Sequence, residues 1–223
     1  MSLFQITPNQ ARLLWVEPHR LVAQGQTRPC EGLPSEDQLA QALSLLPTGA
    51  TKWVVDDLWT PGTILRDIVE VPSGGEPREQ FFRWKYTQSL ALEAPQSVQT
   101  LSLGEAAWLC LGMPTELRDR WVALATRLNR PIHALVPRWL WLYNRLAPTQ
   151  DLPGLLLSLC PHSEGGYTGS LVAWSRQLTL LRQWADPADE ATWMHDRVQP
   201  SASYLGREGR GPRDLWVWGA ASW

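Results

Sequence analysis

The chain has 223 residues, of which 44% are hydrophobic and 19% are charged, and this composition is typical of a globular protein rather than a disordered one. A formal net charge of −2 does not favour binding to nucleic acid or to an anionic membrane surface. The chain has three widely spaced cysteines, and Met1–Gln10 shows no secretory signal, so we expect a cytoplasmic protein. We expect no direct membrane insertion, because no apolar run is long enough to span a membrane.

The first part of the chain is predicted to contain three short strands, a helix and a further strand. The strands are expected at Leu3–Thr7, Ala11–Glu17, His19–Gly25 and Lys52–Asp57. A Pro8-Asn9-Gln10 turn separates the first two strands. The helix is expected at Glu36–Leu46, because Ser35 is a favourable N-cap and leucines recur on one face.

The middle of the chain alternates between strand and helix patterns. Strands are expected at Ile64–Val71, Ser97–Leu103, Ala106–Leu111 and Ile132–Val136. Helices are expected at Glu76–Glu93, from Thr115 or Pro114 to Leu128, and at Arg138–Leu146. The stretch Ala147–Pro153 is the best candidate for a boundary between two lobes.

The last part of the chain repeats the plan of the first part. Strands are expected at Leu155–Cys160, Tyr167–Trp174, Gln177–Trp184 and Asp214–Gly219. A helix is expected at Pro187–Tyr204, with a break near Pro200. The loop before the second strand contains Ser163, Gly165 and Gly166, and such a loop can bind phosphate if it presents free N–H groups.

A β-β-β-α-β unit used twice resembles the plan of the actin-like ATPase superfamily. The segment Lys52–Leu146 is similar to the PilM/GspL group of type IV pilus and type II secretion assembly proteins. The residues that carry this resemblance are Ile64–Pro72, the helix Glu79–Glu93, Leu111-Gly112-Met113-Pro114 and the strand Pro131–Val136.

The resemblance implies an α/β, actin-like (ribonuclease H-like) fold of two lobes, with mixed sheets flanked by helices. The first lobe is expected at residues 1–147, with a smaller sub-lobe at about 58–103. A reduced second lobe, truncated relative to the superfamily, is expected at residues 148–223.

The resemblance also points to a phosphate and metal site, and here the sequence departs from the superfamily pattern. An acidic residue followed by glycines is expected in the first hairpin of each half. The first predicted turn, Ile6–Gln10, has neither, and the second, Leu157–His162, has no carboxylate. Gly219-Ala220-Ala221-Ser222 replaces the glycine run of the adenosine loop. We therefore expect no ATP hydrolysis and no ATP or Mg²⁺ cofactor, with Ser163, Gly165 and Gly166 as a degenerate phosphate loop.

Other reactive side chains have simpler interpretations. Ser158, Cys160 and His162 alternate along a strand, which would suit a nucleophile and a base, but a strand end entering a turn also explains them. The pair Asp56-Asp57 could bind a cation or could be a solvated strand end. The charge of Arg138 is expected to be solvated, and the four histidines lack paired metal-ligand spacing.

The function implied by the resemblance is that of a non-catalytic cytoplasmic scaffold of a pilus or secretion platform. Its expected partners are the cytoplasmic N-terminal peptide of a PilN-like single-pass inner-membrane protein and other platform components. The chain contains 14 tryptophans, and Trp84 and Trp141 are the predicted partner contacts, because Trp141 lies roughly opposite the expected buried face of its helix. The alternatives are a nucleotide-binding ATPase or sugar-kinase-like enzyme on the same fold, and an interaction domain unrelated to pili.

Overall fold

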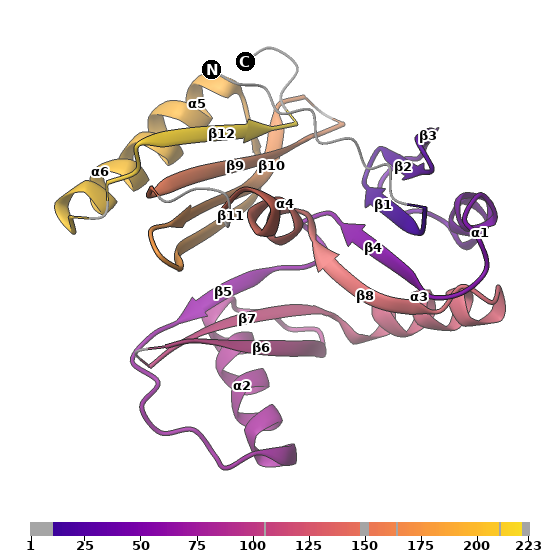
Figure 1. The fold of residues 1–223 in the computed structure, drawn as a ribbon, viewed down its shortest axis with the longest axis horizontal. Coiled ribbons are helices and arrows are strands. Elements are labelled where there is room, and N and C mark those ends of the chain that lie inside the picture. Colours follow the sequence, from indigo (N-terminus) through magenta and orange to yellow (C-terminus); the bar gives the residue numbers. More distant parts are fainter. Residues whose placement is uncertain (1–10, 105, 148–151, 164, 210, 220–223) are drawn as a thin grey trace.

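The computed structural model describes residues 11–104, 106–147, 152–163, 165–209 and 211–219, and these residues build three β-sheets with helices packed against them (Figure 1). The predicted strand Leu3–Thr7, the turn at Ile6–Gln10, most of the Ala147–Pro153 boundary and nearly all of the Gly219–Ser222 loop lie outside the described residues. Among the described helices, none is long and apolar enough to cross a lipid bilayer.

The first sheet has five strands in the order β3-β2-β1-β4-β8. These strands are β1 (Leu13–Glu17), β2 (Arg20–Ala23), β3 (Gln26–Pro29), β4 (Thr51–Val55) and β8 (Ile132–Pro137). Strands β1, β4 and β8 run parallel to one another, whereas β1, β2 and β3 form an antiparallel meander. The carboxyl ends of the three parallel strands therefore meet at one edge of the sheet, which is where ligands bind in open α/β sheets.

Helices cover both faces of this sheet. On one face, α1 (Glu36–Ser44) and α3 (Thr115–Arg127) pack against Trp53 and its neighbours. On the other face, α4 (Arg138–Leu146) lies between the first sheet and the last one. The predicted N-cap of α1 is confirmed. Ser35 Oγ accepts a hydrogen bond from the backbone N–H of Gln38, and Gln38 Oε1 accepts one from the backbone N–H of Ser35.

The second sheet has three antiparallel strands in the order β5-β7-β6. They are β5 (Gly62–Leu65), β6 (Gln96–Gly104) and β7 (Ala107–Pro114), and α2 (Gly75–Ser89) covers one face. The predicted hairpin is confirmed as β6 and β7. The predicted strand Ile64–Val71 is too long at its C-terminal end, because β5 ends at Leu65 and Asp67 adopts a positive φ angle of 58°, which interrupts the extended backbone.

The third sheet has four strands in the order β11-β10-β9-β12. They are β9 (Gly154–Pro161), β10 (Tyr167–Trp174), β11 (Leu178–Ala188) and β12 (Asp214–Trp218), and β12 runs parallel to β9. Helices α5 (Glu190–Thr192), η2 (Trp193–Val198) and α6 (Gln199–Arg207) cover one face. The expected helix break is the π-helical turn η2, and Pro200 follows it in the first turn of α6, where its missing N–H is tolerated.

A tryptophan-rich core joins the first and third sheets. Trp15 of β1 packs edge-on against Trp141 of α4 at 4.9 Å between ring centroids, and it stacks on Trp218 of β12 at 5.8 Å. On the same side, Trp174 of β10 stacks on Trp216 of β12 at 5.3 Å. These contacts explain part of the high tryptophan content, since large rings fill the junction between two sheets and a helix.

Candidate functional site

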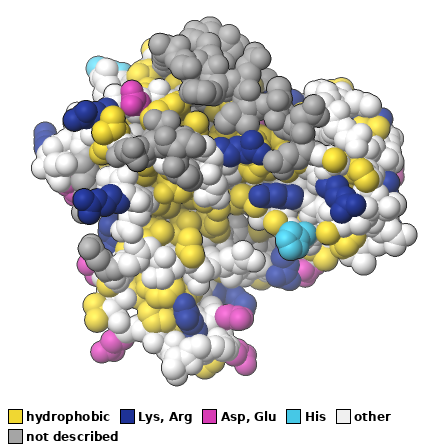
Figure 2. Space-filling view, in the orientation of Figure 1, with side chains coloured by type: hydrophobic (Ala, Val, Ile, Leu, Met, Phe, Trp, Pro, Cys, Tyr) yellow, Lys and Arg dark blue, Asp and Glu magenta, His cyan; other side chains and the backbone are white. Residues whose placement is uncertain are grey.

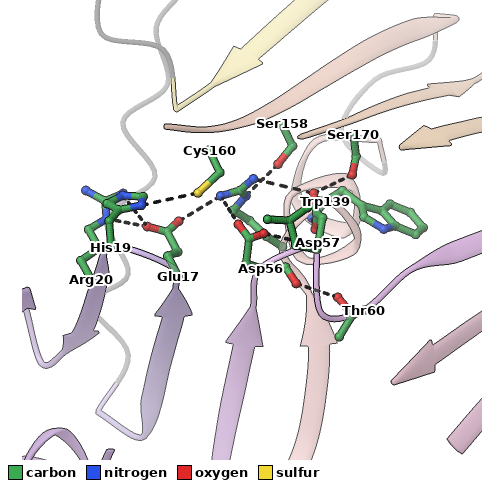
Figure 3. Close-up of polar contacts among 12 residues, drawn as sticks. Glu17, His19, Arg20, Asp56, Asp57, Thr60, Trp139, Ser158, Cys160 and Ser170 are labelled. Atoms are coloured by element: carbon green, nitrogen blue, oxygen red, sulfur yellow. Dashed lines mark hydrogen bonds and ion pairs between the residues drawn. The ribbon is translucent and has the colours of Figure 1, made fainter. Parts of the chain in front are cut away.

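A buried ionic cluster lies where the carboxyl ends of β1, β4 and β8 meet the third sheet. Glu17 is the last residue of β1, Asp56 and Asp57 follow β4, and Arg138 follows β8. Figure 3 shows the side chains of Glu17, Asp56 and Asp57 pointing toward a common region between the two sheets, into which Ser158 also points. All of these side chains are buried. The position of the cluster follows from the parallel arrangement of the three strands.

The guanidinium of Arg138 is the centre of this cluster and is only 1% exposed. Its Nη1 lies 2.9 Å from Asp56 Oδ2 and donates to Glu17 Oε1 at 3.2 Å, and its Nη2 lies 3.8 Å from Asp57 Oδ2. Its Nε donates to Ser158 Oγ at 2.9 Å. One cation therefore contacts three carboxylates from the first sheet and a hydroxyl from the third sheet.

Asp57 links the cluster to α4 and to β10. Its Oδ1 accepts a hydrogen bond at 3.1 Å from the backbone N–H of Trp139, in the first turn of α4, and its Oδ2 accepts one at 2.7 Å from Ser170. A carboxylate at a helix N-terminus satisfies a free amide and interacts favourably with the helix dipole. Gln183 of β11 donates to Ser170 in turn, at 3.1 Å, so the network extends into the third sheet.

The pKa values of the acids reflect a balance between burial and the central guanidinium. Burial opposes ionisation of Glu17, but Arg138 and Arg20 outweigh it, and the pKa of Glu17 is held below its ordinary value. Burial raises the pKa of Asp57 to about 6, against the opposing effect of Arg138. For Arg138, the neighbouring carboxylates outweigh the effect of burial and raise its pKa, so the guanidinium stays charged.

A thiol and an imidazole lie at the margin of the cluster. Cys160 Sγ lies 3.6 Å from Nδ1 of His19, and the other ring nitrogen of His19 lies 3.8 Å from Glu17. This order of groups is that of a nucleophile, a base and an orienting acid. However, burial raises the pKa of Cys160 and lowers that of His19, and the thiol is fully buried, so no reactive thiolate is available.

The structure separates the members of the predicted nucleophile group. Ser158 and Cys160 both lie beside Arg138 and are buried, as alternate residues of β9. His162 lies beyond the end of β9, where its backbone N–H donates to Gly166 O at 3.0 Å. The histidine that contacts Cys160 is instead His19, which is 141 residues away in the chain. No group of three or more metal-ligating side chains that could hold a metal ion occurs in the described residues.

The predicted phosphate loop joins β9 to β10. Gly165 and Gly166 both adopt positive φ angles, which favours glycine, and a Cβ at Gly166 would lie 2.9 Å from Ala188 O. The N–H of Gly165 donates to His162 O at 3.1 Å, so it is used within the loop. Ser163 lies in the same loop, between β9 and β10. The glycines thus have a structural role in the turn and in its contact with β11.

The turn Ile6–Gln10, for which no acid was predicted, lies outside the described residues, but the structure places an acid in the hairpin that follows it. In the described chain, the first hairpin joins β1 to β2 around Pro18 and His19, and Glu17 at the end of β1 pairs with Arg20. The acid is therefore present, but Pro18 follows it in place of a glycine. Hard Mg²⁺ would need the oxygens that Arg138 contacts, and in the β9–β10 loop the N–H groups of His162 and Gly165 are already used in backbone hydrogen bonds. The residues of this site do not fit a Mg²⁺–nucleotide complex.

The two predicted partner-binding tryptophans lie in different environments. Trp84 is 52% exposed on α2, where Lys85 lies 5.0 Å above its ring, as expected for a side chain at the surface. Trp141 is only 3% exposed and packs against Trp15, so the expectation that it lies opposite the buried face is wrong. The physical reason is that α4 is enclosed between two sheets and has no single buried face.

Comparison of the coordinates with solved structures places this arrangement in a known fold. A Bacteroides thetaiotaomicron protein described as having an actin-like ATPase fold and unknown function superposes with a TM-score of 0.57 and 9% identity, over 99% of this chain and 87% of the other. The chain has the actin-like fold. The resemblance inferred from the sequence is therefore confirmed at the level of the fold.

Two further similar structures come from secretion and pilus machines. The cytoplasmic domain of EpsL, an inner-membrane component of the type II secretion system of Vibrio cholerae, has a TM-score of 0.51 and 10% identity, over 94% of this chain and 85% of the other. A chain of a PilM–PilN type IV pilus biogenesis complex has a TM-score of 0.55 and 15% identity, over 92% and 75%. No family model and no curated protein sequence matches the chain significantly.

Sequence reasoning missed Glu17 and Arg138 as members of a common site. Arg138 was expected to be solvated, and Asp56-Asp57 was weighed as a solvated strand end. The available signal was that Glu17, Asp56 and Asp57 lie at the ends of predicted strands and that Arg138 lies two residues beyond one, since the carboxyl ends of parallel strands converge.

Proposed function

We propose that this protein is a non-catalytic cytoplasmic scaffold of a type IV pilus or type II secretion assembly platform. The observation that carries the non-catalytic part of the proposal is the position of Arg138, which contacts three carboxylates at the edge where a metal–nucleotide complex would need them. A guanidinium is permanently charged, and because it is part of the chain it cannot dissociate from the site as a bound metal ion can. The cluster then holds the two lobes together instead of performing phosphoryl transfer.

The platform role is supported by the fold shared with two assembly components. The EpsL domain belongs to an inner-membrane component of a secretion system, and the PilM chain is found in complex with PilN. By analogy, the partner of this protein is a PilN-like single-pass inner-membrane protein, whose cytoplasmic N-terminal peptide binds to a groove beside the smaller sub-lobe. Other platform components would bind elsewhere on the surface, and the protein would be peripheral to the inner membrane through its partner.

Trp84 is the candidate anchor for this interaction on the smaller sub-lobe. It is a large, half-exposed ring on α2, and such rings are enriched among residues that dominate binding energy. Since Trp141 is buried, it is removed from the proposed contact surface.

The proposal is tested with a labelled peptide that corresponds to the cytoplasmic N-terminus of the single-pass membrane protein encoded beside this chain. We expect saturable binding to the purified protein, weakened about tenfold or more by Trp84→Ala. Tyr204→Ala, which truncates another exposed aromatic ring on α6, is the matched control and should bind normally. Absence of binding by the wild-type protein would reject the proposed partner, whereas equal binding by both variants would reject only the Trp84 surface.

A further inference from the structure

Helix α2 covers one face of the three-stranded sheet, where it packs against Leu65 and Cys110. The other face is apolar and packs in part against the core shared with the third sheet. On this second face, Ile64, Leu109 and Leu101 form a row across β5, β7 and β6, because these residues are direct cross-strand partners. Leu109 is buried, whereas Leu101 at the free edge is 60% exposed. Figure 2 shows hydrophobic side chains gathered over this sheet and in the hollow between it and the third sheet.

A cavity of about 320 Å³ adjoins this row of apolar side chains. Ile64 and Leu103 line it from the three-stranded sheet, and Leu178 lines it from the start of β11. Two cations also line it, Arg66 directly after β5 and Arg176 in the β10–β11 turn. The surface thus combines an apolar strip with a basic end.

The charges of these two arginines are not balanced by acids in the described part of the chain. Arg66 donates to the backbone oxygen of Thr179, and no described carboxylate lies within ion-pair distance of Arg66 or Arg176. Arg138 differs, because it has three carboxylate partners. Guanidinium groups bind carboxylates with directional hydrogen bonds. The chemistry that completes this surface is therefore an acidic side chain beside apolar ones.

We propose that this surface, formed by Ile64, Leu101, Leu103, Arg66 and Arg176, is a docking site for an amphipathic, acidic segment of a partner protein. The apolar side chains of that segment cover the leucine row and fill the cavity, and its carboxylates pair with the two arginines. This site is separate from the Trp84 surface, because Trp84 lies on α2, which covers the opposite face of the sheet. This proposal can therefore be tested independently of the proposed binding of the PilN-like N-terminal peptide.

The experiment uses two short synthetic helical peptides labelled with fluorescein. Both carry leucines along one face, and the residues that flank this face are glutamate in one peptide and lysine in the other. Fluorescence anisotropy with the full chain should show binding of the glutamate peptide, at least about tenfold weaker binding of the lysine peptide, and a loss of this preference at high salt. Equal affinity for the two peptides would overturn the proposal.

Variants locate the binding surface. Leu101→Asp and Arg176→Glu should each weaken the glutamate peptide about tenfold, and Arg176→Glu should also strengthen the lysine peptide. The matched controls are Val122→Asp and Arg120→Glu on the exposed surface of α3, and they should have no effect. Circular dichroism confirms that each variant is folded. The proposal would be overturned if the control variants weakened binding as much as the test variants do. It would also be overturned if the protein formed a concentration-dependent dimer that Leu101→Asp abolished, since this would assign the surface to a second copy of the chain.

Discussion

Removing the guanidinium of Arg138 should strongly destabilise the fold. In Arg138→Ala, the carboxylates of Glu17 and Asp56 lose a cation that lies 3.2 and 2.9 Å away, and both remain buried. Breaking a buried ion pair by removing one partner typically costs about 3–5 kcal/mol, because the remaining charge is not compensated. For a chain of this size, such a loss corresponds to a decrease of roughly 6–20 °C in the melting temperature.

Urea unfolding followed by tryptophan fluorescence measures this loss directly. The matched control is Arg127→Ala, which breaks the exposed pair between Arg127 and Glu36 and should cost only about 0–1 kcal/mol. Arg138→Met combined with Glu17→Gln and Asp56→Asn should recover much of the stability, because it removes the charges together. If Arg138→Ala cost no more than the Arg127 control, the assignment of the guanidinium as the centre of a buried cluster would be refuted.

Three further predictions follow from the same structure. The pKa of Asp57 is raised from 3.8 to about 6 in the fold, so its contribution to stability is complete below about pH 4 and is lost as the pH rises through 6, by about 3 kcal/mol. Asp57→Asn should remove this dependence of the free energy of unfolding on pH, and an unchanged dependence between pH 4 and 6 would contradict the assignment. Gly169→Ala should destabilise the third sheet by at least about 1–3 kcal/mol, because the new Cβ would lie 2.1 Å from Ser158 O. The control is Gly206→Ala in α6, where a Cβ would meet no atom within 4 Å, and it should stabilise the protein by up to about 1 kcal/mol. Comparable melting temperatures for the two variants would argue against this packing. The three cysteines are free and buried, so a thiol-reactive dye should label them only as the protein unfolds in urea, and rapid labelling of the native protein would be inconsistent with their burial.

Local patterns were sufficient to predict most of the elements. The N-cap at Ser35, the leucine spacing of α3 and the alternation in β10 are each determined by neighbouring residues, and the structure has these elements close to the predicted bounds. The strand predicted at Ile64–Val71 ends at Leu65 because the backbone of Asp67 adopts a positive φ angle, and the side-chain pattern of this stretch does not reveal that change.

The contacts of the ionic cluster were not predicted, because they join distant parts of the chain and only the positions of the strand ends indicated that these residues converge. Glu17 and Arg138 are 121 residues apart, and Asp57 and Trp139 are 82 residues apart. An arginine at the start of a helix is usually solvated, and only the convergence of three strand ends buries this one. Similarly, Trp141 was placed on an exposed face because helical periodicity assumes one buried side, whereas α4 is enclosed between two sheets.

The most direct test of the central claim is a calorimetric titration of the purified protein with ATP, with and without Mg²⁺. If Arg138 has replaced the metal–nucleotide complex, neither titration should show saturable binding, and ATP with Mg²⁺ should not raise the melting temperature. Micromolar, Mg²⁺-dependent ATP binding that is lost in Glu17→Gln would contradict the account and would favour an enzyme on the same fold.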